Sequence, residues 1–264
     1  MIARLPGATI AYDDVGDGPP IVFLHAFPLD RAMWEPQVSA LAHRARCIAP
    51  DLPGFGGSSS SRPPSMEQWA DDVAALLDHL EVRRAVIAGL SMGGYVALAL
   101  WRRHPERVRA LVLADTRADA DSPDARERRR ELIALAEREG SAAVAARQLT
   151  GLIGRSTRER APELVEHVRR LLERAPVPGI VGALQGMMAR PDATSTLATI
   201  SVPTLVVTGD EDVLTPPRDG RRMHERIPQS GFELLAGAGH LSSLERPAAF
   251  NHLLGELLDG LDGT

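Results

Sequence analysis

The uncharged segment between Arg84 and Arg102 places the strongest constraint on how this chain folds. It is slightly too short for a membrane-spanning helix, and three glycines interrupt it. A buried strand over Ala85–Ala88, a tight turn and a buried helix over Ser91–His104 explain the segment better. A fully apolar strand of this kind is typical of a parallel sheet that is covered on both faces.

The same alternation of strands and helices recurs along most of the chain. We expect strands at Ile2–Leu5, Ala8–Asp13, Ile21–Leu24, Arg46–Pro50, Ala85–Ala88, Val108–Ala114, Thr204–Thr208 and Phe232–Leu235, the first two forming a hairpin. We expect helices at Arg31–His43, Ser65–Leu80, Ser91–His104, Pro217–Ile227 and Pro247–Leu258, and a Gly- and Ser-rich loop over Asp51–Ser61. Strands that alternate with helices predict an α/β fold with a doubly wound, mostly parallel sheet flanked by helices.

Between residues 116 and 192 the strand signals disappear and helical stretches rich in Arg and Glu replace them. These stretches are Pro123–Glu139, Ser141–Ile153, Arg158–Arg174 and Pro178–Ala189. We therefore predict a core domain of residues 1–115 and 193–264, with a helical insertion, residues 116–192, after the sixth strand. The charges of the insertion are explained most simply as the solvated faces of amphipathic helices.

Composition excludes several classes of function. The formal net charge is −5, so no basic field favours nucleic acid as a partner. All 30 basic residues are Arg, and the absence of Lys excludes a Schiff-base lysine, a P-loop lysine and a Ser–Lys dyad. The one cysteine, Cys47, excludes a disulfide within the chain and makes a cysteine metal site unexpected. The N-terminus has no apolar run of signal-peptide length, so we expect a cytoplasmic protein, monomeric or homodimeric, with no membrane partner.

The pattern Gly89-Leu-Ser91-Met-Gly93 identifies a candidate nucleophile. Ser91 falls between a predicted strand and a predicted helix, where the backbone is strained and only small neighbours leave room. Such a turn lifts the hydroxyl above the sheet, with the amide of Met92 pointing to where an oxyanion would form. A serine that only caps the helix is the alternative. The two glycines and the preceding strand favour the nucleophile.

A serine hydroxyl needs a base that removes its proton, and His240 is our candidate. It lies in a loop after the last predicted strand, at the carboxyl edge of the sheet. His25, directly after an earlier strand, is a rival, but its position favours a loop-bracing role. Six other histidines lie on or beside charged predicted helices and are expected at the surface: His43, His79, His104, His167, His224 and His252.

The base in turn needs a carboxylate that fixes its tautomer. Three acids follow the strand Thr204–Thr208, and we choose Asp212, with Asp210 next and Glu211 last. The order of nucleophile, acid and base along the chain is the one described for hydrolases with a nucleophile elbow. The loop after Ile21–Leu24 is expected to supply a second oxyanion donor, the N–H of Phe27, beside that of Met92.

Together these residues resemble the α/β-hydrolase superfamily, and within it the cap-bearing group of 3-oxoadipate enol-lactonase-like proteins and carboxylesterases. The resemblance covers nearly the whole chain and rests on His25-Ala-Phe-Pro-Leu-Asp30 with Trp34, Asp51-Leu-Pro-Gly-Phe-Gly-Gly-Ser58, Gly89-Leu-Ser-Met-Gly-Gly94, His104-Pro-Glu-Arg-Val108, Val202-Pro-Thr-Leu-Val206 and Gly239-His240. It implies an α/β-hydrolase fold with a helical cap, and the same roles for Ser91, Asp212, His240 and the two amides. Many relatives have His-Gly where this chain has His25-Ala26, which slightly reduces the backbone freedom beside the oxyanion hole.

The function expected from these residues is hydrolysis of a small carboxylic ester or lactone through an acyl-enzyme on Ser91, with no metal, nucleotide or flavin cofactor. A carbon–carbon bond hydrolase and a cofactor-free perhydrolase or haloperoxidase, both using the same triad, are alternatives. A ligand-binding member without activity is a further one. Relatives with an Asp nucleophile are disfavoured because position 91 is Ser.

The insertion is expected to cover the carboxyl edge and to supply much of an apolar substrate pocket. Candidate wall residues are Leu149, Leu152, Ile153, Leu184, Met187 and Met188 in the insertion, and His25, Phe27, Met92, Leu214 and Leu241 in the core. An acidic lactone would also need a positive partner, for which Arg147 and Arg190 are examples.

Overall fold

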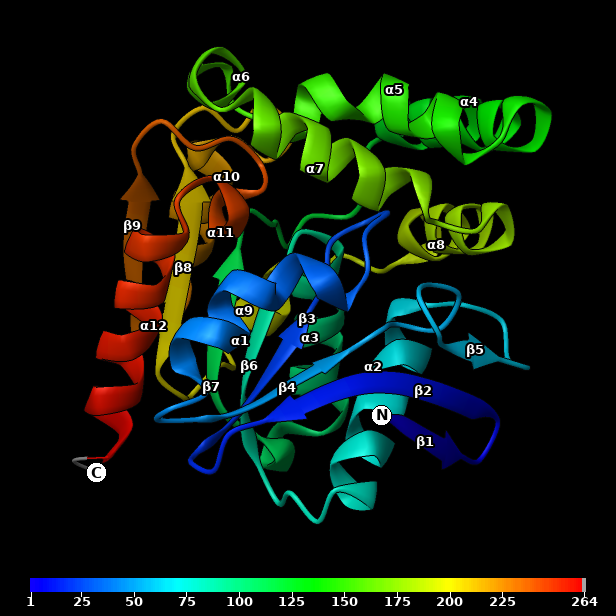
Figure 1. Ribbon diagram of the computed structural model, residues 1–264. Coiled ribbons are helices and arrows are strands. Elements are labelled where there is room, and N and C mark those ends of the chain that lie inside the picture. Colours follow the sequence, from blue (N-terminus) through cyan, green and yellow to red (C-terminus); the bar gives the residue numbers. More distant parts are fainter. Residues whose placement is uncertain (263–264) are drawn as a thin grey trace.

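A nine-stranded sheet runs through the described part of the chain, residues 1–262, in the computed structural model (Figure 1). Its strands are β1 (Ile2–Leu5), β2 (Ala8–Val15), β3 (Pro20–Leu24), β4 (Arg46–Pro50), β5 (Ser59–Ser60), β6 (Ala85–Leu90), β7 (Val108–Ala114), β8 (Thr204–Gly209) and β9 (Ser230–Leu235). The order across the sheet is β1-β2-β4-β3-β6-β7-β8-β9, with β5 paired to β2. From β4 to β9 every neighbouring pair is parallel, whereas β1 and β2 form the predicted antiparallel hairpin. The predicted mostly parallel α/β sheet is confirmed.

Helices account for most of the remaining chain. They are α1 (Glu35–Leu41), α2 (Met66–His79), α3 (Met92–Arg103), α4 (Pro123–Glu139), α5 (Ser141–Leu152), α6 (Arg155–Arg160), α7 (Pro162–Glu173), α8 (Val177–Ala189), α9 (Thr194–Leu197), α10 (Pro217–His224), α11 (Ser242–Glu245) and α12 (Pro247–Asp262), with 3₁₀ turns at Arg31–Trp34 and Pro105–Arg107. Among the described residues, none of these helices has the length and apolar character needed to cross a bilayer.

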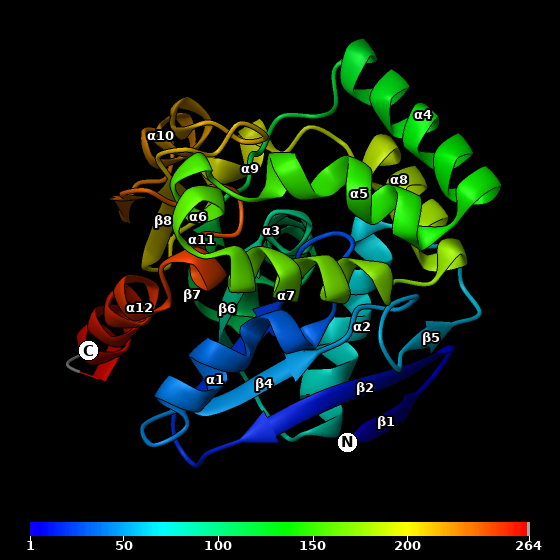
Figure 2. The same ribbon diagram turned by 45° about the horizontal axis from the view of Figure 1, so that its top comes forward.

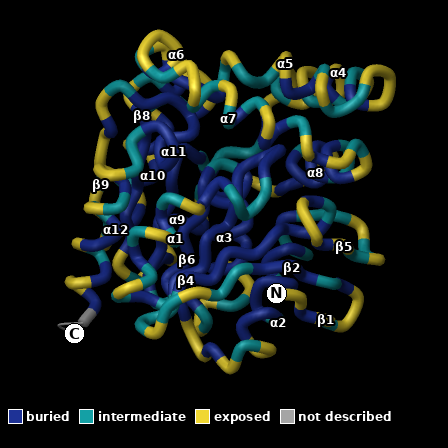
Figure 3. Tube along the Cα trace, viewed as in Figure 1, coloured by how far each residue is buried: buried dark blue, intermediate teal, exposed yellow. Residues whose placement is uncertain are grey.

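Both faces of the sheet are covered, which explains why its central strands are apolar throughout. Val22 and Leu24 of β3 pack in one core with α2 and α3, whereas Ile21 and Phe23 pack in a second core with α1 and α12. Because successive side chains of a strand point to opposite faces, each central strand contributes to both cores. Figure 3 shows the result as a continuously buried centre with exposure confined to outer turns and helix faces.

Helix α3 lies very close to the sheet. A Cβ added at Gly93 would lie 2.1 Å from the backbone oxygen of Leu24 in β3. Only a glycine permits this approach, and it brings the start of α3 against the carboxyl end of β3. The end of β6 and the loop after β3 therefore meet at one point, where the strand order of the sheet reverses direction from β3 to β6.

Helices α4 to α8, called the inserted helices below, lie between β7 and β8 in the sequence. Figures 1 and 2 show them as a layer over the edge at which the parallel strands end; these green to yellow-green helices lie in the upper part of Figure 1 and come toward the viewer in Figure 2. Strand β7 is the sixth of the predicted strands, because the two-residue β5 was not predicted. The division of the chain into a core and a separate cap at residues 116–192 stays a prediction.

The predicted helix Arg158–Arg174 is wrong as a single element. The chain breaks at Ala161, whose φ and ψ are −137° and 63°, so that α6 ends at Arg160 and α7 begins at Pro162. A residue before proline is disfavoured in the helical region, which accounts for the break. The predicted helix Arg31–His43 begins as a 3₁₀ turn and ends at Leu41. The short elements β5, α9 and α11 span four residues or fewer and carry no periodic pattern from which to predict them.

The close approach at Gly93 leads to a stability prediction. In Gly93→Ala the added methyl group meets a backbone oxygen, which can move only if strand β3 or helix α3 shifts, so we expect a loss of about 1–3 kcal/mol in the free energy of unfolding. Gly255→Ala, in α12, is the matched control, because its nearest neighbour is the flexible end of Arg44 at 3.5 Å. It should gain roughly 0.5–1 kcal/mol from the removal of a helical glycine. Urea denaturation measures both; equal effects of the two substitutions would contradict the steric explanation.

Candidate active site

Ser91 lies in strained backbone at the junction of β6 and α3. Its φ and ψ are 54° and −113°, in a region of the Ramachandran plot that residues other than glycine rarely occupy. Its amide donates to the carbonyl of Ala114 in β7 at 2.9 Å, and its carbonyl accepts from the hydroxyl of Thr116 at 2.8 Å. A Cβ at Gly89 would lie 2.3 Å from the carbonyl oxygen of Gly93. Both glycines of the sequence pattern are therefore needed for the turn.

His240 is buried beside Ser91. Its Nε2 atom is 2.7 Å from the Ser91 Oγ, and its Nδ1 atom is 2.8 Å from Oδ2 of Asp212. When the Nδ1 proton faces the carboxylate, Nε2 is left to accept the proton of the serine hydroxyl. The structure thus brings together the three residues that the sequence pointed to, in the order of contacts that a serine nucleophile requires.

Of the three acids after β8, only Asp212 contacts the imidazole. Its Oδ1 accepts from the amides of Leu214 and Thr215 at 2.8 and 3.0 Å, and its Oδ2 accepts from the Thr215 hydroxyl at 2.6 Å. Asp210 instead accepts from the Gly237 amide, and Glu211 from Ser156. The choice left open among these acids therefore falls geometrically on Asp212.

The charges of the pair are adjusted by their surroundings. Burial alone would raise the pKa of Asp212, but the charge and hydrogen bond of His240, together with Thr215, outweigh it and lower that pKa. Burial would lower the pKa of His240, whereas the charge and hydrogen bond of Asp212 raise it. Asp115 adds to the increase only when it is ionised, and Arg117 acts in the opposite direction. The net pKa of His240 is raised, so the imidazolium formed on proton abstraction is stabilised.

Asp115 is a buried acid that we did not anticipate. It follows β7 directly, with φ 44°, and its Oδ1 accepts from the Gly209 amide at 2.8 Å. Its Oδ2 accepts from the hydroxyl and amide of Ser242, two residues beyond His240. Burial, and then the charge of Asp212, raise the pKa of Asp115 to about 8. The sequence did contain a signal for Asp115: it is an acid directly after a central strand, and parallel strands all end at the edge of the sheet where Ser91 lies.

The two candidate oxyanion donors also lie at the site. Phe27 and Ser91 both line one cavity, and Met92 follows Ser91 at the first position of α3. Within residues 1–262, neither the Phe27 nor the Met92 amide N–H has a hydrogen-bond acceptor in the chain. Two unpaired N–H groups beside a serine hydroxyl are suited to binding a developing oxyanion.

His25 braces the loop that carries Phe27. Its Nε2 accepts from the Leu52 amide at 2.9 Å, which leaves Nδ1 to donate to the carbonyl of Ala26 at 3.0 Å. Burial lowers the pKa of His25, in keeping with a neutral ring. The prediction that His25 lines the substrate pocket is wrong: the side chain is fully buried, both ring nitrogens are bonded inside the fold, and His25 is not part of the cavity wall.

The cavity above Ser91 has a volume of about 350 Å³ and is enclosed by the core on one side and the inserted helices on the other. Of the predicted wall residues, Leu184 and Leu214 line it, together with Leu152 and Met187. Leu149, Ile153 and Leu241 were predicted wrongly, since none of them lines the cavity. Ile153 and Leu241 are buried in the core on the α1 and α12 side, and Leu149 packs against that core. Met188 does not line the cavity either. It follows Met187 in α8, and one helical step of about 100° points its side chain in another direction.

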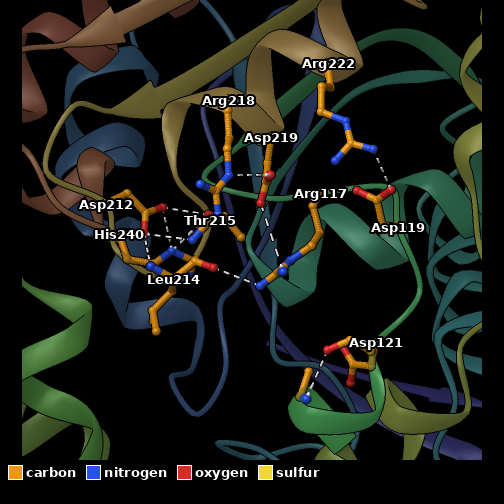
Figure 4. A network of polar contacts seen from close by, with 12 residues as sticks. Arg117, Asp119, Asp121, Asp212, Leu214, Thr215, Arg218, Asp219, Arg222 and His240 are labelled. Atoms are coloured by element: carbon orange, nitrogen blue, oxygen red, sulfur yellow. Dashed lines mark hydrogen bonds and ion pairs between the residues drawn. The ribbon is translucent and has the colours of Figure 1, made fainter.

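The cavity is more charged than predicted. Arg117, Arg128, Arg129 and Asp121 belong to its wall, and Tyr95 and Gln148 add polar groups. Figure 4 shows Arg117 reaching toward Leu214, whose carbonyl accepts from its guanidinium at 2.8 Å, on the same side as Asp212 and His240.

The two arginines named as examples lie elsewhere. Arg147 is exposed on α5 and does not line the cavity. Arg190 is buried: it forms an ion pair with Asp121 at 2.7 Å, and its guanidinium stacks 4.0 Å above the ring of Tyr95. The sequence alone did not show which arginine would form an ion pair with a buried acid and so be unavailable to a substrate.

Comparison with known proteins places this geometry in context. The family model of the α/β-hydrolase fold matches residues 19–247. The enzyme 3-oxoadipate enol-lactonase 2 of Acinetobacter baylyi is 32% identical over 237 residues, which cover 89% of this chain and 87% of that protein. A thermophilic esterase from Thermogutta terrifontis has a TM-score of 0.96 and 39% identity, covering 99% of both chains. The enol-lactonase from Burkholderia xenovorans has a TM-score of 0.91 and 30% identity, covering 98% of this chain and 100% of that one.

The raised pKa of Asp115 predicts how stability depends on pH. The folded chain keeps the Asp115 proton up to about pH 8, whereas an unfolded Asp loses it near pH 4, at its ordinary pKa of about 3.9. The stability from this group is therefore complete below about pH 4 and is lost as the pH rises toward 8. Asp115→Asn mimics the neutral acid and removes this dependence. Urea denaturation at pH 5, 6.5 and 8 should show the variant gaining stability relative to the wild type as pH rises. A difference that stays constant over this range would contradict a protonated Asp115.

Proposed function

Because the chain belongs to the α/β-hydrolase family and is an enzyme of that kind, we propose that it hydrolyses a carboxylic ester or lactone through an acyl-enzyme on Ser91. The observation that carries the proposal is the continuous series of contacts from Asp212 through His240 to the Ser91 hydroxyl, 2.8 and 2.7 Å long, at the floor of a cavity. The names of its relatives, an enol-lactonase of Acinetobacter baylyi and an esterase of Thermogutta terrifontis, support ester or lactone substrates.

The first half of the reaction forms the acyl-enzyme. His240 Nε2 takes the proton of the Ser91 hydroxyl as the oxygen attacks the substrate carbonyl carbon. The carbonyl electron pair moves onto oxygen, and the amides of Phe27 and Met92 hold this oxyanion. Collapse of the tetrahedral intermediate breaks the bond to the leaving oxygen, which takes the proton from His240. An ester then releases its alcohol, whereas a lactone opens and keeps the new hydroxyl within the acyl chain.

The second half restores the enzyme. Water gives a proton to His240 as its oxygen attacks the acyl carbon, and a second oxyanion forms against the same two amides. The Ser91 oxygen leaves with the proton from His240, and a carboxylic acid is released. The raised pKa of His240 serves this cycle, because the ring must hold a proton in each half before it returns it.

We also propose that residues 116–192 act as a cap that determines substrate choice. Much of the cavity wall comes from α4, α5 and α8, whereas Ser91, Asp212 and His240 all lie on loops of the core. We expect a small substrate and a cytoplasmic enzyme. We expect this enzyme to be a monomer or a homodimer.

The charges of the cavity favour a substrate with a carboxylate away from the scissile bond. Arg128 is exposed at the cavity, and its guanidinium has no hydrogen bond or ion pair within residues 1–262. Arg117 differs, because it already donates to the carbonyl of Leu214 at 2.8 Å and pairs with Asp219 at 4.0 Å. Arg129 also differs, because Asp121 already binds its guanidinium. A carboxylate on the substrate would give Arg128 the acceptor that the chain does not supply.

The proposal predicts that Ser91 becomes covalently modified. A fluorophosphonate should add one group to the wild type, located at Ser91 by peptide mass spectrometry, and none to Ser91→Ala. Hydrolysis of p-nitrophenyl acetate by the variant should fall at least about 10³-fold, as for other removed nucleophiles. Ser59→Ala, an exposed serine of β5, is the matched control and should keep full activity. Equal hydrolysis by wild type and Ser91→Ala would refute the proposal.

A substrate panel separates the proposed reaction from the two that use the same triad. Aryl esters, aliphatic esters and lactones should be cleaved without peroxide, whereas dienoic ketones should not. Preferential cleavage of a dienoic ketone would identify a carbon–carbon bond hydrolase. Turnover that requires hydrogen peroxide would identify a perhydrolase.

The unpaired Arg128 predicts a preference for anionic esters. Arg128→Ala should raise the KM for an ester that carries a free carboxylate by roughly two- to fivefold, the range expected of an exposed ion pair, and leave a neutral ester of the same size unchanged. Arg126→Ala, on the same helix but outside the cavity, is the matched control. The difference between the two esters should shrink at high salt because exposed charges are screened. A loss shared equally by both esters would contradict a role in carboxylate recognition.

A further inference from the structure

Glu245 lies beneath the loop that carries His240. It is the last residue of α11 and is 5% exposed. Its Oε1 accepts from the amide of Gly239 at 2.9 Å and from that of Leu241 at 3.3 Å. These are the residues on either side of His240. One carboxyl oxygen therefore holds the backbone on both sides of the imidazole.

The second oxygen of Glu245 binds the inserted helices. Its Oε2 accepts from the amide of Gly154, the residue before α6, at 2.9 Å. Two glycines make this contact possible, because a Cβ at Gly239 would lie 2.2 Å from the Gly154 nitrogen, and one at Gly154 would lie 2.7 Å from the Gly239 nitrogen. The start of α6 and the His240 loop are thus in direct backbone contact.

A second acid makes a parallel connection from the other catalytic loop. Glu211 precedes Asp212, and its Oε2 and Oε1 accept from the amide and the hydroxyl of Ser156 at 2.7 and 2.5 Å. Its own amide donates to the carbonyl of Ala238 at 2.8 Å, which joins the acid loop to the loop of His240. Two carboxyl groups, one from each loop, therefore bind the free amides at the beginning of α6.

We propose that Glu245 is a positioning residue for His240, and that with Glu211 it couples the position of the inserted helices to the geometry of the base. This inference rests on the proposed function, because it assumes that His240 acts on Ser91. The coupling has a direct chemical use: the helices that surround the substrate are bound to the two loops that bring Asp212 and His240 to it.

The geometry explains why the effect should reach the reaction itself. All three amides that meet Glu245 need an acceptor inside the protein, and each one left unpaired costs free energy. The loop would relax around the loss, and His240 would move relative to Ser91 and Asp212. A displacement of about 1 Å at reacting groups can cost about 10²-fold in rate. A residue with a purely structural role would lower stability and leave the rate of the folded enzyme unchanged.

Two substitutions divide the contacts of Glu245. Glu245→Gln can keep an oxygen toward Gly239 and Leu241, but its NH₂ group then faces the Gly154 N–H, so only the connection to α6 is lost. Glu245→Ala loses both connections. Ser156→Ala removes the hydroxyl donor to Glu211 and tests the same junction from the helical side, even if Glu245→Ala fails to fold. Glu166→Gln is the matched control, because Glu166 is an exposed acid of α7 whose side chain pairs with Arg169 and not with the residues of the junction.

The measurements are the rate of acylation by the fluorophosphonate, kcat and KM for p-nitrophenyl acetate, and hydrogen exchange of peptides that cover residues 152–160 and 235–242. For Glu245→Ala we expect kcat and the acylation rate to fall about 10²-fold with little change in KM, and both peptides to exchange faster. For Glu245→Gln we expect a smaller fall, about tenfold, with faster exchange mainly in residues 152–160. Ser156→Ala should resemble Glu245→Gln, and Glu166→Gln should resemble the wild type.

The pH profile gives a readout that loss of stability alone would not change. The groups that act on the His240 charge are Asp212, which raises its pKa, Asp115, which does so only when ionised, and Arg117, which lowers it. If His240 moves away from Asp212 in Glu245→Ala, the acidic limb of kcat/KM should shift toward lower pH, because the pKa of the ring is then held up less.

Two results would overturn the inference. One is a Glu245→Ala enzyme that is less stable but is acylated at the wild-type rate with an unchanged pH profile. The other is Glu245→Gln and Ser156→Ala variants whose rates and hydrogen exchange match those of Glu166→Gln. Failure of the proposed function is distinguishable from either, because the wild type itself would then show no acylation of Ser91.

Discussion

The strained backbone of Ser91 is the constraint on which the rest of the site depends. A φ of 54° at a residue with a side chain costs free energy, of order 1–3 kcal/mol, and persists only where its surroundings determine it. Here β7 accepts from its amide, Thr116 donates to its carbonyl, and glycines at positions 89 and 93 remove the side chains that would collide. The strain has a result: the hydroxyl points out of the sheet toward the imidazole instead of lying along the helix.

The parallel sheet explains why so many polar groups converge on that hydroxyl. Five neighbouring strands end at one edge, and each contributes one group from the loop that follows it: Phe27 after β3, Ser91 after β6, Asp115 after β7, Asp212 after β8 and His240 after β9. The loops after β8 and β9 then bring His240 between Ser91 and Asp212, which it contacts through its two ring nitrogens. Asp115 accepts from Gly209 at the end of β8 and from Ser242 two residues after His240. A neutral acid there can bind donors on both sides without adding a second negative charge beside Asp212.

Prediction from the sequence succeeded where a pattern was local. Periodicity and glycines were enough to predict the fold class, the strand before Ser91 and the helix after it. Chain order was enough to predict that Asp212 and His240 lie next to each other. Prediction failed where neighbours come from distant segments. Asp115 gains its importance only from the pairing of β7 with β8. Ile153 and Leu241 lie just outside helices, at the end of α5 and before α11, and both are buried in the core, which helical periodicity could not show. Arg190 looked like an available cation, and the structure shows it committed to Asp121.

The junction at Gly154 has a consequence for exchanging parts between relatives. The segment that holds the inserted helices is continuous in sequence, so it invites transplantation onto another core as one piece. Its start and end lie side by side, since the Ala193 amide donates to the Ala118 carbonyl at 2.9 Å, and its middle is fastened at Gly154 and Ser156 to acids that would belong to the recipient. A transplanted segment would need a residue without a side chain at the first of these positions and a hydroxyl at the second, or the recipient would lose the packing beneath its own imidazole. In such chimaeras the match between the segment and its new core thus depends in part on two small residues that do not line the cavity.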